Sequence, residues 1–253
     1  MKYLFILLIL TLPVSLFAQD QEEEGHWQEA SAASAASEAY HTFRLKNSTP
    51  PYGLAKVKSL IKKINTRTED NSDYYDSPMS RKIYLNLSLR EKFTYHMIYP
   101  ESYSQNCDVS APIIDEEKKI LGNLPDVFSE SNWSRRQLDF MVSNRDSVLS
   151  LIKESVNRSK RMGLNYKTAI VEVNGREMIP FLIDFYLTDR KDNDILTVLT
   201  LLLKKNEYKP FMTSASFIKL YGKKSNYQSF INLNNDNVDL VISRAKAYYD
   251  EIR

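Results

Sequence analysis

The chain has 253 residues, of which 43% are hydrophobic and 26% charged, and its formal net charge at pH 7 is +2. This composition is typical of a globular protein, and the length suits one large or two small domains that bury a core without metal ions or disulfides. The near-neutral charge argues against a nucleic-acid-binding protein, which would carry a strong basic excess.

The first residues have the pattern of a secretory signal. Lys2 supplies the positive charge, Leu4–Leu12 the apolar stretch, and Ala18 the small residue before the cleavage point. The apolar stretch is shorter than the ~20 residues that a helix needs to cross a bilayer. We therefore expect residues 1–18 to be a cleaved signal peptide. The remaining chain would be exported, periplasmic or secreted, with no integral membrane span.

Residues 19–49 open with an acidic segment rich in alanine and serine, which has no Lys or Arg before Arg44. Its Ala/Ser run offers no large apolar side chain to bury, so we expect a disordered tether or a lone surface helix. Pro50 and Pro51 then mark the start of the folded part. We divide that part into an N-terminal helical region, 50–125, and a C-terminal helical array, 126–253, continuous with it.

Residues 178–203 show the clearest helical pattern in the sequence. Apolar side chains recur at i, i+3, i+4, i+7 and i+8 from Ile179, and again from Ile195, which places each set on one face of a helix. The charged break between the two sets predicts an αα-hairpin. Its second helix would be capped by a side-chain oxygen of Asp192, Asn193 or Asp194.

Similar spacing and capping signals predict further helices along the chain. They cover about 54–64, 89–99, 116–121, 133–142, 145–162, 166–173, 211–222 and 235–249. The fold class is therefore all-α or mainly α, as an irregular helical bundle or an α-solenoid of the HEAT or armadillo kind. Asn174-Gly175 is also a strong hairpin signal, so the alternative is an α+β fold with a small hairpin near 166–182.

Cys107 is the only cysteine, so the chain cannot form an intramolecular disulfide, and a buried thiol is the favoured interpretation. The alternative is a thiol-dependent hydrolase or redox-sensitive protein, with His96 as base, Cys107 as nucleophile and Glu101 or Asp108 orienting the base. Two features oppose this. His96 shares the apolar face of its helix, and no glycine occurs in residues 54–121 to shape an oxyanion hole.

The sequence carries no motif for a metal or a cofactor. His-x-x-x-His and Cys-x-x-Cys spacings are missing, as are the glycine-rich patterns that bind phosphate groups. We therefore predict no metal site and no cofactor.

Several aromatic residues lie in or near predicted loops and helix ends, among them Tyr99, Tyr103, Trp133 and Tyr166. Exposed Tyr and Trp suit contacts with proteins or glycans, because they combine a large rigid area with a polar group. We assign binding to Tyr99, Tyr103 and Trp133. The sequence thus favours an exported, non-enzymatic binding or scaffold protein of the cell envelope, which contacts a protein or glycan through a helical surface.

Overall fold

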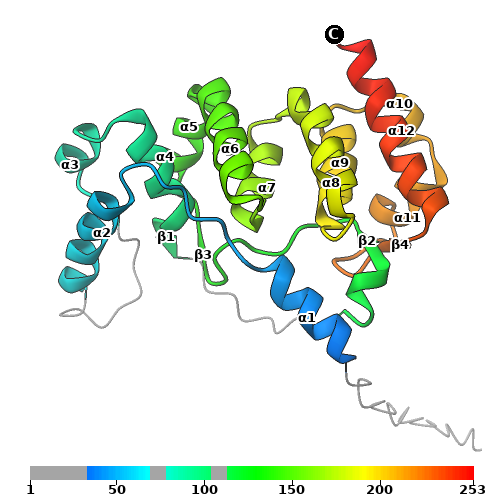
Figure 1. Ribbon diagram of the computed structural model, residues 1–253, viewed down its shortest axis with the longest axis horizontal. Coiled ribbons are helices and arrows are strands. Elements are labelled where there is room, and N and C mark those ends of the chain that lie inside the picture. The colour runs from blue at the N-terminus through cyan, green and yellow to red at the C-terminus, as the bar shows by residue number, and fades with distance from the viewer. Residues whose placement is uncertain (1–32, 69–77, 104–112) are drawn as a thin grey trace, which may run out of the picture. The chain divides into compact units, whose positions relative to one another are not determined.

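The computed structural model describes residues 33–68, 78–103 and 113–253 (Figure 1). Ala32–Arg253 form one compact unit. Helices dominate it and the only strands of the described ranges are short, so the mainly α fold class is confirmed. In these ranges no helix is long and apolar enough to cross a membrane. The predicted signal peptide lies outside them.

The elements follow one another along the chain with short connections. The first part contains α1 (Ala35–Arg44), α2 (Leu54–Thr68), α3 (Arg81–Leu85), α4 (Leu89–Ile98), β1 (Ser102–Tyr103), η1 (Glu116–Lys118), β2 (Lys119–Leu121), β3 (Ser131–Asn132) and α5 (Arg135–Ser143). The second part contains α6 (Arg145–Ser159), α7 (Leu164–Glu172), η2 (Arg176–Met178), α8 (Ile179–Asp189), α9 (Asp194–Lys205), α10 (Lys209–Met212), α11 (Ala215–Tyr221), β4 (Phe230–Asn232) and α12 (Asn235–Glu251).

The helices α8 and α9 form the predicted αα-hairpin at the centre of the core. Every apolar residue of the α9 pattern is fully buried: Ile195, Val198, Leu199, Leu202 and Leu203. Helix α9 packs against α7, α8 and α12, and Figure 1 shows α8, α9 and α12 beside one another. The period of 3.6 residues was sufficient to identify this hairpin because both stripes face the same core.

The strands join segments that are far apart in the sequence. β1 pairs with β3, and β2 pairs with β4 so that Ile120 lies opposite Ile231. The helix expected over 116–121 is therefore wrong, because its second half is taken into this long-range pair. The hairpin considered near 166–182 does not form, since α7, η2 and α8 occupy that stretch.

Capping side chains set several helix boundaries. Ser88 and Glu91 form a capping box at the start of α4, where the sequence predicts a helix over 89–99. Helix α5 begins two residues later than expected, because Ser134 and Gln137 form its capping box and the residues just before it lie in β3. The single helix expected over 211–222 is two, α10 and α11, with Ser214 capping the second.

The structure departs from the expected tether at its carboxyl end. Residues 35–44 form α1, whose first turn is capped by Ser34, and Arg44 and Ser48 are buried. Arg44 is buried because ion pairs compensate its charge, as described below. The acidic first half of the tether lies outside the described residues. A solenoid-like stacking and a division near residue 125 stay predictions.

We expect Leu199→Ala to lower the free energy of unfolding by about 2–5 kcal/mol, because it leaves a cavity among fully buried side chains. Leu187→Ala is the matched control. Its side chain is 44% exposed on the partner helix, so the loss should stay below about 1 kcal/mol. Urea unfolding followed by circular dichroism measures both, and equal losses would contradict the placement of α9 at the core.

Candidate functional site

Five ionisable side chains meet in the interior and form a buried charge network: Arg44, Glu116, Lys167, Asp192 and Asp194. Each is at most 5% exposed. The Lys167 ammonium lies 2.9 Å from an Asp192 oxygen and 3.0 Å from an Asp194 oxygen. The Arg44 guanidinium lies 2.8 Å from Asp194 and 3.1 Å from Glu116. Asp194 therefore bridges the two cations.

The network is assembled from four distant elements: α1, η1, α7 and the turn that begins α9. It contains three carboxyl groups, one guanidinium and one ammonium, so it holds one excess negative charge when all five groups are charged. The imidazole of His41 lies at its outer end, with Nδ1 3.0 Å from Glu116 Oε2, and that side chain is half exposed. The network thus runs from the core to the surface.

The two aspartates of the network respond differently to their surroundings. Burial alone would raise the pKa of Asp194, but the charges of Lys167 and Arg44 outweigh it and hold that pKa below its usual value. In Asp192, burial outweighs the attraction of Lys167, so its pKa is raised. Of the two aspartates, Asp194 accordingly holds its negative charge more firmly.

The capping role expected for the turn before α9 is wrong. Asn193 is the residue at the cap position, but its side chain makes no capping hydrogen bond. Its amide nitrogen donates instead to the carbonyl of Glu117, while Asp192 and Asp194 bind Lys167 and Arg44. Ion pairs with distant cations have taken the place of the local cap.

A cavity of about 800 Å³ opens beside the outer end of the network. Arg44, Glu116 and His41 contribute to its lining. Its apolar lining comes from Ala33, Ile113, Leu124, Pro125 and Tyr227, and further carboxylates come from Glu38 and Asp126. We call this space the acidic cavity. It combines a fixed ionic base with apolar walls.

His96, the base of the thiol hypothesis, is fully buried. Its Nε2 lies 3.1 Å from the Tyr84 hydroxyl, and its Nδ1 has no hydrogen-bond partner among the described residues. Burial lowers the pKa of His96 to about 3, with smaller contributions from Arg136 and Lys92. Such an imidazole is a weak base. Cys107 and Asp108 lie outside the described residues, so the dyad itself stays a prediction.

Glu101 has a structural task in a different set of contacts. Its carboxylate accepts hydrogen bonds from the Tyr95 hydroxyl at 2.7 Å and the Ser134 hydroxyl at 2.5 Å, and it pairs with Arg136. These contacts tie α4 to the start of α5. In the described residues no hydrogen bond joins Glu101 to His96, so nothing supports Glu101 as the residue that orients this base.

The aromatic residues assigned to binding are half-buried rather than fully exposed. Trp133 donates its indole N–H to the His96 carbonyl at 2.7 Å, and the ring of Tyr99 stacks on Tyr95 with centroids 5.6 Å apart. Tyr103 lies in β1. Tyr166, expected near the surface, is fully buried and bonded to Ser155. The rings of Tyr99 and Trp133 cover edges of the core. A binding role for Tyr99, Tyr103 and Trp133 stays a prediction.

Within the described ranges, no group of three or more His, Cys, Asp or Glu side chains is placed to hold a metal ion. The sequence matches no protein-family model, and searches of curated proteins and of solved structures return no significant match.

Sequence reasoning missed the buried network and the acidic cavity beside it. The available signal was Lys167, a cation in a helical stretch that also carries Leu164, Tyr166, Ala169 and Ile170. A lysine in a buried helix needs a carboxylate partner, but the sequence alone does not say which one.

We expect Asp194→Asn to lower the free energy of unfolding by about 3 kcal/mol, because both cations lose their shared carboxylate while remaining buried. Asp184→Asn, at an exposed position on α8, removes the same charge and should cost less than about 0.5 kcal/mol. Chemical unfolding of both variants at pH 7 provides the comparison. Equally small losses of unfolding free energy in the two variants would show that the network contributes little to stability.

The lowered pKa of His96 should make the protein lose stability in acid. Unfolded His96 takes up a proton below about pH 6.5, whereas the folded residue stays neutral down to about pH 3. The contribution of neutral His96 to the free energy of unfolding is therefore fully present above pH 6.5. Below pH 6.5 it falls by ~1.4 kcal/mol per pH unit.

The stability difference between wild type and His96→Gln, measured from pH 7 to pH 4, should show this slope. Tyr84→Phe keeps the imidazole and should keep the slope. A difference that does not change with pH would mean that His96 takes up its proton at the same pH in the folded and unfolded protein, and would contradict the lowered pKa.

Proposed function

We propose that the chain is an exported, non-enzymatic binding or scaffold protein of the cell envelope, and that the acidic cavity binds a basic side chain of a protein partner. The observation that carries this proposal is the contact between the cavity and the buried charge network, through Arg44 and Glu116. The proposal of export rests on the sequence of residues 1–18.

Buried ion pairs form the floor of the acidic cavity. They favour recognition of a ligand, because they hold the polar groups of the floor in one geometry. The Arg44 guanidinium is fixed between Asp194 and Glu116 and lies 3% exposed. Burying charges costs free energy that hydrophobic packing would not, so such a network suits a site that needs defined polar groups more than maximal stability. Preformed cavities of ~300–1,000 Å³ with a few fixed polar groups are the usual form of ligand sites.

The lining favours a ligand that carries a positive charge on an apolar stem. Glu38 and Asp126 are exposed carboxylates with no ion pair within the described part of the chain. Tyr227, 46% exposed, and Leu124 offer apolar contact beside them. Lysine and arginine side chains have this combination of a cationic head and an apolar stem. A neutral glycan would leave the carboxylates without a matching charge.

The thiol enzyme is the less favoured function. A general base should have a pKa near the working pH, and burial places that of His96 at about 3. Both nitrogens of its ring are also buried within the protein: Nε2 faces Tyr84, and Nδ1 is enclosed without a partner among the described residues.

The binding proposal can be tested with benzylamine, a cation on an apolar ring, and benzyl alcohol as its neutral counterpart. In ¹⁵N NMR titrations we expect only benzylamine to shift the amide signals of residues lining the acidic cavity. Asp126→Asn should weaken that binding by about two- to fivefold, as expected for a solvent-exposed charge pair.

Glu130→Gln serves as the control, since it removes an exposed carboxylate four residues away that does not line the cavity. Equal binding of benzylamine and benzyl alcohol, or equal weakening in both variants, would contradict a charge-selective cavity.

A further inference from the structure

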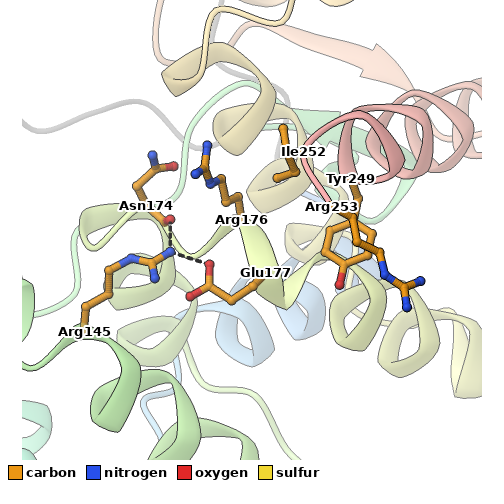
Figure 2. Close-up of a pocket in the computed structure, with 7 residues that line it drawn as sticks. All are labelled: Arg145, Asn174, Arg176, Glu177, Tyr249, Ile252 and Arg253. Atoms are coloured by element: carbon orange, nitrogen blue, oxygen red, sulfur yellow. Dashed lines mark hydrogen bonds and ion pairs between the residues drawn. The ribbon is translucent and has the colours of Figure 1, made fainter.

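A second cavity, of about 500 Å³, lies between the turn that precedes α8 and the end of α12 (Figure 2). Asn174, Arg176 and Glu177 line it from the turn, and Arg145 lines it from the start of α6. The end of the chain contributes Tyr249, Ile252 and Arg253. We call this space the arginine cavity, since three of its seven lining residues are arginines.

Arg145 holds the turn in place, and acceptors of the protein itself bind its guanidinium group. Its Nε donates to the Val173 carbonyl at 2.8 Å, its Nη2 donates to the Asn174 carbonyl at 2.7 Å, and it pairs with Glu177. The dashed lines in Figure 2 mark the contacts with Asn174 and Glu177. Asn174 has a positive φ of 51°, a conformation that few residue types adopt readily and that these contacts secure. Arg145 therefore shapes the cavity wall.

Arg176 and Arg253 differ from Arg145, because both are exposed and neither forms an ion pair in the part of the chain that the structure describes. Figure 2 shows that they come from two separate elements, the turn before α8 and the end of α12. Glu177 is already paired with Arg145. Among the described residues, the cavity lining thus has two guanidinium groups without an ion pair, those of Arg176 and Arg253.

We infer that the arginine cavity binds an acidic peptide segment, with a carboxylate on Arg176. A planar guanidinium matches a carboxylate through two parallel hydrogen bonds. Tyr249 and Ile252, the latter 36% exposed, line the same cavity as the arginines and offer an apolar surface to a neighbouring side chain of the same peptide. This site is separate from the acidic cavity and does not depend on the function proposed for it.

A peptide fits this lining better than a compact inorganic anion does. The Glu177 carboxylate lies within the cavity and repels a doubly charged phosphate more strongly than a single carboxylate. A peptide also spaces its carboxylates along a chain, so that they can approach Arg176 and Arg253 separately. Its intervening residue can then contact Ile252, a contact that phosphate lacks.

The test is a titration of the full chain with the capped tripeptide acetyl-Glu-Leu-Glu-amide at low salt, followed by ¹⁵N NMR. We expect saturable shifts at the residues lining the arginine cavity. Arg176→Gln should weaken this binding about fivefold. Arg158→Gln is the matched control, because it removes an exposed arginine on α6 that does not line the cavity and has no ion pair in the described residues.

Three further ligands complete the experiment. Acetyl-Gln-Leu-Gln-amide, which lacks the charges, and acetyl-Glu-Ser-Glu-amide, which lacks the apolar residue, should both bind more weakly. Inorganic phosphate should not compete at equal concentration. Equal losses in the two arginine variants, shifts outside the cavity, absence of saturable binding, or phosphate binding as tight as the peptide would each overturn the inference.

Discussion

The contact between Asp194 and its two cations, Lys167 and Arg44, is the interaction on which the arrangement of the amino-terminal helix depends. Each charged group loses its hydration water on folding, at a cost of several kcal/mol per ion. Ion pairs offset this cost only when the partner groups lie at the right distance and orientation. Asp194 begins α9, Lys167 belongs to α7, and Arg44 ends α1. The same three groups therefore fix α1 on the core and place the base of the acidic cavity.

The helices with strong local signals could be predicted from the sequence, and the contacts between distant segments could not. Both helices of the 178–203 hairpin follow a period that only a helix satisfies, and the Ser88–Glu91 capping box is local by construction. Ile120 gave no comparable signal, because its strand exists only through pairing with Ile231, more than a hundred residues further along the chain. Pairing partners at such separation are not encoded in a local period.

The buried charge network shows why the candidate site was harder to predict than the fold. Asp192 and Asp194 lie in a charged break between helices, where solvated caps are the common outcome, and their chemistry fits that role equally well. Only Lys167, which shares α7 with several apolar residues, indicated that a buried carboxylate partner must exist. In the opposite direction, Tyr166 was assigned to a helix end from its position, whereas packing against α4 and α6 buries it.

The distribution of charge, more than its sum, determines what each surface can bind. The net charge of +2 is a sum over the whole chain, and it does not reveal that two cavities of the protein have linings of opposite character. The guanidinium groups of Arg44 and Arg145 are both bound by acceptors of the protein itself, and each holds part of a cavity lining in place. The groups left over beside them are carboxylates in one cavity and guanidinium groups in the other. In both places a paired arginine fixes part of the lining. Neighbouring side chains without an ion pair among the described residues would set the charge of the ligand that we propose for each cavity.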